Sequence, residues 1–202
     1  MDTNTWESER GKNLTFSLIL YPPFAADRQF VLNKAISLGI YDFLDAEIPN
    51  EKISIKWPND IYIGDRKVCG ILIQNSVIGN RLEYVVVGIG LNVNQMVFTG
   101  DAPNPVSMKM VTGIEYSLDE LIHRLLQSIF SRYIQVKPQT SRTIENDYQK
   151  ALYRLMEWHE FRVRGLKINA RITATNEYGQ LLLETKDQQI IVCDLAEVKF
   201  VL

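Results

Sequence analysis

The chain has 202 residues, of which 46% are hydrophobic and 23% are charged, and its formal net charge is -2. These values are typical of a folded, water-soluble protein and argue against disorder and collagen-like repeats. Because acidic and basic residues nearly balance, we expect neither nucleic acid nor an acidic membrane as a partner.

The sequence lacks membrane-spanning or signal-like segments and paired-cysteine patterns, and both observations bear on the cellular location of the protein. No apolar run reaches the ~18 residues needed to span a bilayer, and the first residues are polar rather than signal-like. Cys69 and Cys193 are the only cysteines and match neither a disulfide framework nor a metal-ligand spacing. The sequence therefore predicts a reduced, cytoplasmic protein.

Hydrophobic periodicity predicts an α+β first part of the chain. Pro22-Pro23 closes the first strand, Gly64-Asp65-Arg66 and Gly79-Asn80 are typical of tight hairpin turns, and Ser117 with Glu120 forms a capping-box pattern. The expected strands are residues 14–21, 53–57, 61–63, 67–77 and 82–94, and the expected helices are residues 28–44, 117–133 and 144–158. Residues 95–111 contain Pro103 and Pro105 and are expected to form an irregular working loop.

After Trp158 the helical period stops and short strands follow. They are expected at residues 161–163, 168–173, 181–184, 190–193 and 198–201. About 40 residues of close-set strands favour a small barrel, because closure removes exposed strand edges. We expect one domain over residues 1–156 and a second over residues 157–202.

The two predicted hairpins bring a cation, a carboxylate and three glycines onto one patch of sheet. Turn lengths set the expected register: Gly70 faces Ile89, Ile71 faces Gly88, Lys67 faces Asn92 and, across a three-residue loop, Asp60 faces Gly70. The patch then contains Asp60, Lys67, Gly70, Gly88, Gly90 and Asn92.

Glycine inside a strand weakens it and often marks the close approach of a ligand or another backbone. Three glycines beside a lysine and a carboxylate suggest a floor for a flat ligand. The alternative is that they are bulges or packing gaps and that Lys67 is an ordinary surface lysine. The run Lys56-Trp57-Pro58-Asn59-Asp60 points back to the same patch and favours the ligand floor.

Several common site patterns are absent from the sequence. Gly88-Ile89-Gly90 lacks the third glycine of a dinucleotide fingerprint, because position 93 is valine, and no phosphate loop occurs. His123 and His159 lack the spacing of zinc ligands or of a catalytic dyad. With two histidines, the sequence favours chemistry that depends on charge stabilisation.

At these residues the sequence resembles the biotin protein ligases. The resemblance rests on Lys56-Trp57-Pro58-Asn59-Asp60, on Arg66-Lys67-Val68-Cys69-Gly70-Ile71-Leu72 and on Gly88-Ile89-Gly90-Leu91-Asn92-Val93-Asn94, with support from Trp6-Glu7-Ser8 and from Pro105-Val106-Ser107-Met108. It implies a class II aminoacyl-tRNA synthetase-like mixed sheet with helices, followed by an SH3-like barrel.

The resemblance also implies a two-step reaction. Biotin and ATP give biotinyl-5'-AMP, and the biotinyl group then passes to a lysine of a biotin carboxyl carrier protein, with Mg²⁺ accompanying ATP and no prosthetic group. The implied catalytic residues are Lys67, Lys56 and Asp60, with Asp60 also a Mg²⁺ ligand. The implied biotin contacts are Lys67, Gly70, Ile71, Gly88 and Gly90, and the implied nucleotide contacts are Trp6, Asn59 and Asn92.

The sequence departs from the family pattern before Trp6. The family's Gly-Arg-rich adenylate loop and its earlier Ser/Thr-Asn segment have no counterpart in this sequence. Either the start is misassigned, the chain is a fragment, or it is a shortened relative. Without the loop, we expect an N-terminally truncated ligase whose adenylate is open to water. An exposed sheet edge would favour pairing of two copies into a homodimer. The alternatives are a lipoate-protein ligase and a non-catalytic biotin-binding or interaction remnant.

Overall fold

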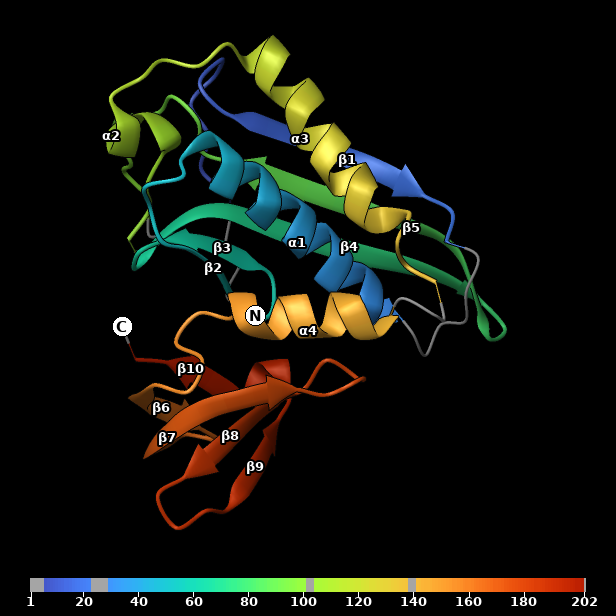
Figure 1. Ribbon diagram of the computed structural model, residues 1–202, viewed down its shortest axis with the longest axis vertical. Coiled ribbons are helices and arrows are strands. Elements are labelled where there is room, and N and C mark those ends of the chain that lie inside the picture. Colours follow the sequence, from blue (N-terminus) through green and yellow to red (C-terminus); the bar gives the residue numbers. More distant parts are fainter. Residues whose placement is uncertain (1–5, 23–28, 101–103, 138–140, 202) are drawn as a thin grey trace.

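The described residues form two antiparallel five-stranded sheets, with helices packed against one face of the first sheet (Figure 1). The structure is a computed structural model that describes residues 6–22, 29–100, 104–137 and 141–201. The fold is therefore α+β, as the sequence predicts. The start of the first predicted helix at Arg28 and the loop residue Pro103 lie outside the described residues.

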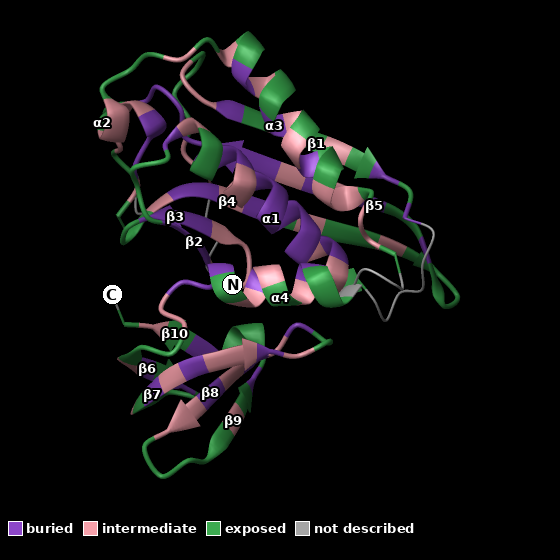
Figure 2. Ribbon diagram, in the orientation of Figure 1, coloured by how far each residue is buried: buried purple, intermediate pink, exposed green. Residues whose placement is uncertain are grey.

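The first sheet has the strand order β1-β5-β4-β3-β2. Its strands are β1 (Leu14–Leu20), β2 (Ile53–Lys56), β3 (Asp60–Ile63), β4 (Arg66–Ile78) and β5 (Arg81–Leu91). Burial alternates along β1, β4 and β5, because one face packs on the helices and the other is open. The distant end of the β4–β5 hairpin is exposed (Figure 2).

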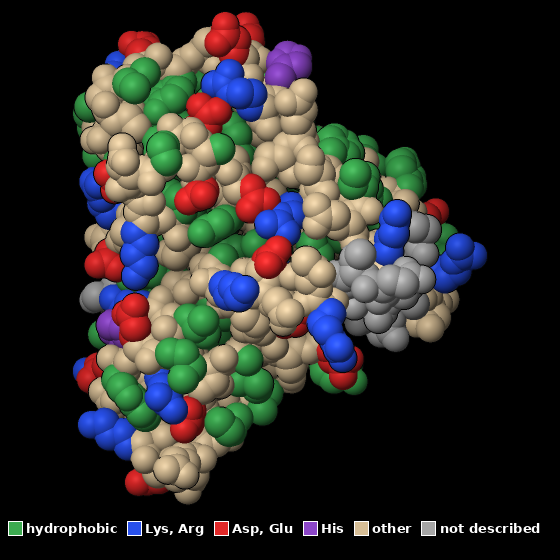
Figure 3. All heavy atoms as spheres, viewed as in Figure 1, with side chains coloured by type: hydrophobic (Ala, Val, Ile, Leu, Met, Phe, Trp, Pro, Cys, Tyr) green, Lys and Arg blue, Asp and Glu red, His purple; other side chains and the backbone are tan. Residues whose placement is uncertain are grey.

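In the described part of the chain, four helices accompany this sheet: α1 (Gln29–Glu47), α2 (Met108–Thr112), α3 (Leu118–Tyr133) and α4 (Ser141–Ala151). Gly39 lets α1 approach α3 closely, because a Cβ atom there would lie 2.6 Å from the Ile129 Cα atom. On the helical face, acidic and basic side chains are interspersed rather than gathered by sign (Figure 3), and Arg132 pairs with both Asp42 and Asp147. Within the described residues, no helix is long and apolar enough to cross a membrane.

The second sheet has the strand order β10-β6-β7-β8-β9. Its strands are β6 (Trp158–Val163), β7 (Leu166–Thr175), β8 (Leu181–Thr185), β9 (Ile190–Cys193) and β10 (Val198–Phe200), with a 3-10 turn (Leu195–Glu197) before β10. All five match predicted strands, with ends that differ by a few residues. Cys69 and Cys193 are buried and free, so no disulfide joins them.

Two predicted segments differ from the structure. Residues 108–112 form α2 rather than irregular loop, because the Ser107 side chain accepts a hydrogen bond from the Met110 N–H and Gly113 ends the helix at a positive φ of 73°. The last predicted helix ends at Ala151 rather than at Trp158. Backbone bonds from Tyr153 N–H to Ile55 and from Met156 N–H to Ile172 take the chain out of the helix and join both sheets.

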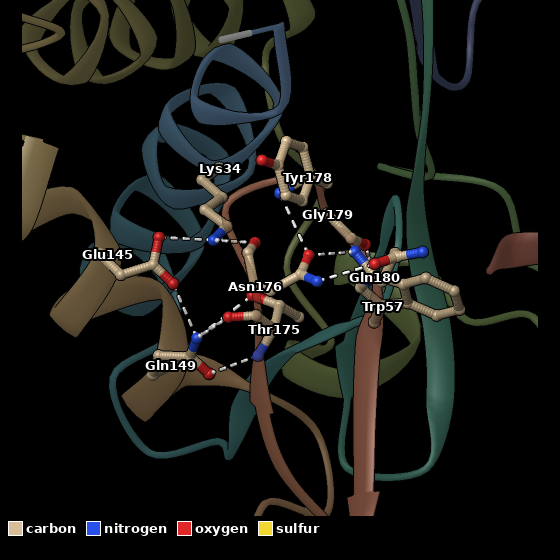
Figure 4. A network of polar contacts seen from close by, with 9 residues as sticks. All are labelled: Lys34, Trp57, Glu145, Gln149, Thr175, Asn176, Tyr178, Gly179 and Gln180. Carbon is tan, nitrogen blue, oxygen red and sulfur yellow. Dashed lines mark hydrogen bonds and ion pairs between the residues drawn. The ribbon is translucent and has the colours of Figure 1, made fainter. Parts of the chain in front are cut away.

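A buried lysine lies where α1, α4 and the turn after β7 meet (Figure 4). Lys34 is 1% exposed, and its ammonium donates to Glu145 and, at 3.3 Å, to the Asn176 carbonyl oxygen. The rings of Phe30 and Tyr148 lie 5.2 and 5.4 Å from the same ammonium. This cluster joins the helical layer to the second sheet.

The two partners of this ion pair should differ in their cost to stability. Glu145→Gln leaves the buried Lys34 charge without a counter-charge, and we expect a loss of about 3 kcal/mol in the free energy of unfolding. Lys34→Met leaves a Glu145 side chain that is 35% exposed and can be hydrated. We therefore expect this variant to lose only about 1 kcal/mol in the free energy of unfolding. Urea unfolding measures both, and equal losses would contradict the asymmetry.

Candidate functional site

Two glycines face each other at the centre of the first sheet. Gly70 on β4 pairs with Gly90 on β5, not with Ile89 as turn length predicts, because a bulge between Ser76 and Val77 shifts the register by one residue. The same shift pairs Gly88 with Leu72 rather than with Ile71. Gly70, Gly88 and Gly90 therefore share the open face of the sheet, and we call these three residues the glycine floor.

The first hairpin places Asp60 beside this floor. Asp60 faces Gly70 as predicted, but the turn contains only Gly64 and Asp65, and a bulge between Ile61 and Tyr62 restores the expected pairing. β1 adds two small hydroxyl residues that the sequence reading missed, since Thr15 faces Gly90 and Ser17 faces Gly88. Both are exposed, so β1 is open on this face of the sheet.

An ion pair joins Lys67 to Asp60 at the edge of the glycine floor. The Lys67 ammonium lies 2.6 Å from Asp60 Oδ1, with side chains that are 24% and 18% exposed. The same ammonium would lie 3.3 Å from a Cβ atom at Gly70. Lys67 pairs with Tyr62 and Pro105 rather than with Asn92. The predicted cation and carboxylate are thus together at the floor, though by a different register.

The Trp6 ring covers two of the three residues of the glycine floor, Gly70 and Gly90. A Cβ atom at Gly90 would overlap this ring, and one at Gly70 would lie 3.0 Å from Trp6 Cζ3, whereas a Cβ atom at Gly88 would have its nearest neighbour at 3.7 Å. The Lys67 ammonium lies 5.7 Å from the ring centroid. Trp6 Nε1 is buried and has no hydrogen-bond partner within the described residues. Trp6, expected near adenosine, thus lies on glycines expected near biotin.

Glu7 anchors the segment that carries Trp6. Its carboxylate accepts hydrogen bonds from the Thr99 N–H at 2.9 Å, the Gly100 N–H at 2.7 Å and the Thr99 hydroxyl at 3.1 Å. The backbone bonds from Thr99 and then Gly100 lower the pKa of Glu7. The sequence reading assigned Glu7 no role, and the loop that donates these hydrogen bonds is 92 residues away in the chain.

Lys56 presents a second cation near Asp60. Its ammonium lies 5.4 Å from the Tyr62 ring centroid and 4.8 Å from that of Phe200 in the second sheet. Burial lowers the pKa of Lys56, against the nearby Asp60 carboxylate, which raises it. Among the described residues, the ammonium has no hydrogen bond and no ion pair within 4 Å.

Three other predicted site residues support the backbone around the floor. Asn59 donates from its side-chain amide to the Ile71 carbonyl oxygen at 2.7 Å, directly after a cis Trp57–Pro58 peptide bond. The Ile71 side chain is 3% exposed and, by strand alternation, points away from the Gly70 face. The Ile71 side chain thus lies on the covered face of the sheet, and the expected contact of Ile71 with biotin stays a prediction.

Asn92 is also buried, at 3% exposure, and its amide donates to the Val106 carbonyl oxygen at 3.1 Å. Asn92 Oδ1 is buried without a partner in the described part of the chain. The loop that it holds continues the site, because Lys67 N–H donates to Asn104 and Val106 N–H donates to Lys67. The predicted working loop thus lies beside Lys67.

The described residues contain no group of three or more His, Cys, Asp or Glu side chains that could form a metal site. Asp60 supplies a single carboxylate, already paired with Lys67. One carboxylate suits a Mg²⁺ ion that is held mainly by substrate phosphates and water, and it does not suit a resident ion held by the protein alone.

Comparison with known proteins bears on this geometry. Residues 2–92, which include the Trp6 segment and both hairpins, match the sequence model of the Biotin/lipoate A/B protein ligase family. This segment of the chain is therefore similar to that family. The family match covers the glycine floor and its two cations, while the helices after residue 92 and the second sheet lie outside it.

Two relatives in the family are bacterial. The bifunctional ligase/repressor BirA of Bacillus subtilis (strain 168) is 30% identical over 60% of this chain and 36% of its own length. The biotin–[acetyl-CoA-carboxylase] ligase of Paracoccus denitrificans is 33% identical over 60% of this chain and 52% of its own. The chain thus spans about half or less of the length of these relatives.

Solved structures of the family share the fold over nearly the whole chain. The apo structure of the biotin protein ligase from Aquifex aeolicus has a TM-score of 0.76 and 25% identity, covering 94% of this chain and 82% of that one. The same enzyme in complex with biotin and ATP has a TM-score of 0.76 and 24% identity, covering 94% and 79%. The second sheet therefore belongs to the shared architecture.

Proposed function

We propose that this protein is a biotin protein ligase that forms biotinyl-5'-AMP from biotin and ATP and transfers biotin to a lysine of a biotin carboxyl carrier protein. The observation that carries the proposal is the Lys67–Asp60 pair beside the glycine floor, within the segment that matches the family. The related Paracoccus protein is named a biotin–[acetyl-CoA-carboxylase] ligase, and the related Aquifex ligase binds biotin and ATP.

The first step joins two anions. A biotin carboxylate oxygen attacks the α-phosphorus of ATP, and the bond from that phosphorus to the bridging oxygen breaks to release pyrophosphate. Two unit negative charges at 4 Å repel by about 4 kcal/mol at an effective dielectric of 20. The Lys67 ammonium, which would lie 3.3 Å from a Cβ atom at Gly70, would offset this repulsion, most strongly as charge builds in the transition state.

The second step needs less from the protein. The carrier lysine amine attacks the carbonyl carbon of the mixed anhydride, loses a proton, and displaces AMP. Gly70, Gly88 and Gly90 would leave room for a flat ring against the sheet, and Thr15 and Ser17 add hydroxyls at its border. Asn59 and Asn92 would act by holding the backbone on either side.

Mg²⁺ would enter as part of the nucleotide substrate. Asp60 would offer it one carboxylate. Lys56 would meet the phosphates, which is supported by an ammonium that has no acidic partner within ion-pair distance among the described residues. The ion would supply charge neutralisation at the phosphates. Trp6 would have to leave the floor or stack on the ligand that occupies it.

The finer architecture is part of the same proposal. We assign the first sheet and its helices to a class II synthetase-like domain over residues 1–156, and the second sheet to an SH3-like barrel over residues 157–202. The strand order β10-β6-β7-β8-β9 supports the second assignment. Cytoplasmic location is supported by two buried free cysteines, and a homodimer stays a prediction.

Transfer of labelled biotin to a purified carrier domain tests the proposal. We expect transfer that requires ATP and that excess lipoate does not inhibit. Lipoate transfer would instead identify a lipoate-protein ligase, and biotin binding without ATP-dependent transfer would identify a binding remnant. Either outcome contradicts the proposed function.

A further inference from the structure

Lys56 owes its position to an aromatic residue of the other sheet. Its ammonium lies between the ring of Tyr62 on the neighbouring strand and the ring of Phe200 on β10, at 5.4 and 4.8 Å. Phe200 in turn lies 5.3 Å from the Phe161 ring and 6.3 Å from the Tyr153 ring. The ring that faces Lys56 is thus held by neighbours on β6 and on the connection between the sheets.

The connection between the sheets fixes this arrangement through backbone pairing. Leu152 forms a bridge with Ile55, next to Lys56, and Leu155 forms one with Ile172 in the second sheet. Between them, Tyr153 donates its hydroxyl to Asp65 at 2.6 Å and packs its ring at 5.2 Å from Tyr62. The second sheet therefore cannot shift relative to β2 without moving the rings around Lys56.

The environment of Lys56 is unusual for a lysine that has only a structural role. A partly buried ammonium normally gains a carboxylate or carbonyl partner, as Lys34 does with Glu145 and Asn176. Lys56 has two ring faces instead, and among the described residues no acceptor is bonded to it. Ring faces stabilise a cation without neutralising it, so the charge stays available to an anion.

We propose that Phe200 is a positioning residue: with Tyr62 it holds the Lys56 ammonium toward the pyrophosphate portion of the nucleotide, so that docking of the second sheet completes the anion site of the first. This inference rests on the proposed function for the identity of the nucleotide. Phe200 lies outside the segment that matches the family, and the inference gives it an indirect role in phosphate binding through Lys56.

Phosphate binding by ring variants tests the proposal. We expect Phe200→Leu to weaken binding of inorganic pyrophosphate about tenfold by calorimetry and to raise the KM for ATP by a similar factor, because water replaces the ring and the ammonium loses its orientation. Phe200→Tyr keeps the ring face and should restore both values. The affinity for biotin should change less than twofold in either variant.

The matched control is Trp158→Leu, which removes a comparable cation–ring contact in the same sheet, that of Arg171 at 5.2 Å. It should leave pyrophosphate binding unchanged. If Phe200→Leu does not fold, Phe200→Met retains the apolar volume without the ring and replaces it in the comparison. Unchanged pyrophosphate affinity in the folded ring-less variant, or an equal loss in the control, would overturn the proposal.

The wild-type chain separates this inference from the proposed function. Ring-dependent pyrophosphate binding together with no biotin transfer would support the positioning role of Phe200 and contradict the ligase activity. Biotin transfer by the wild-type chain, with both transfer and pyrophosphate affinity unchanged in Phe200→Leu, would support the ligase activity and contradict the positioning role of Phe200.

Discussion

Lys67→Ala is expected to reduce biotin-dependent exchange between ATP and pyrophosphate by about a hundred- to a thousandfold. The substitution removes a cation whose offset of about 4 kcal/mol acts where carboxylate and phosphate meet, and each 1.4 kcal/mol corresponds to about tenfold in rate. The affinity for biotin alone should fall only about tenfold, because a single bound carboxylate depends less on the Lys67 cation than two anions that approach each other in the transition state. Exchange kinetics and calorimetry measure the two quantities separately.

A matched control is available in the second sheet. Lys167 forms an ion pair with Glu160 at 2.8 Å, similar to that of Lys67 with Asp60, but on β7, outside the first sheet. Lys167→Ala should leave both measurements unchanged. Equal losses of exchange and biotin affinity in Lys67→Ala would remove the transition-state role and leave Lys67 as a binding residue.

Gly90→Ala is expected to displace Trp6 and to weaken biotin binding about a hundredfold. The new methyl group would overlap the indole ring and would occupy the middle of the glycine floor, where a flat ligand must approach the sheet. The sheet itself should remain, because alanine keeps every backbone hydrogen bond of β5. The chain has three tryptophans, which can be labelled with fluorotryptophan and observed by fluorine NMR. The resonance of Trp6 should move, while those of Trp57 and Trp158 should stay in place.

Gly88→Ala is the control for the tryptophan signal. A Cβ atom at that position meets Leu72 at an ordinary 3.7 Å and does not reach Trp6, so the Trp6 resonance should stay in place. The double variant Trp6→Ala with Gly90→Ala separates the two causes, since recovered biotin affinity would show that the displaced indole blocks the ligand. An unmoved Trp6 resonance in Gly90→Ala would contradict the close contact.

The sequence predicts the strands well because alternation and turn residues are local signals, but it does not predict the bulges. A bulge between Ser76 and Val77 changes the pairing of every β4 residue on the side away from the turn, and therefore replaces the predicted Gly70–Ile89 pair by Gly70–Gly90. The Asp60–Gly70 pair is confirmed only because a second bulge offsets a turn that is one residue shorter than predicted.

The same distinction between local and distant signals applies to the candidate site. Lys67, Asp60 and the three glycines could be placed together from the sequence, because all of them lie on two adjacent hairpins. The contacts of Glu7 with Thr99 and of Phe200 with Lys56 could not, because no local pattern relates residues so far apart in the chain. The early end of α4 was missed for a similar reason, since tertiary pairing of Tyr153 overrides a helical pattern.

Trp57 shows what such distant contacts impose on the sequence. Its indole N–H donates at 2.8 Å to the main-chain oxygen of Gly179, 122 residues away, in the turn that links β7 to β8. A backbone oxygen can be supplied by any residue, but a Cβ atom at Gly179 would overlap the Phe30 ring. Insertions or deletions in this turn should therefore be poorly tolerated even though Glu177 and Tyr178 in it are exposed, because they would leave the buried indole N–H of Trp57 without a hydrogen-bond acceptor.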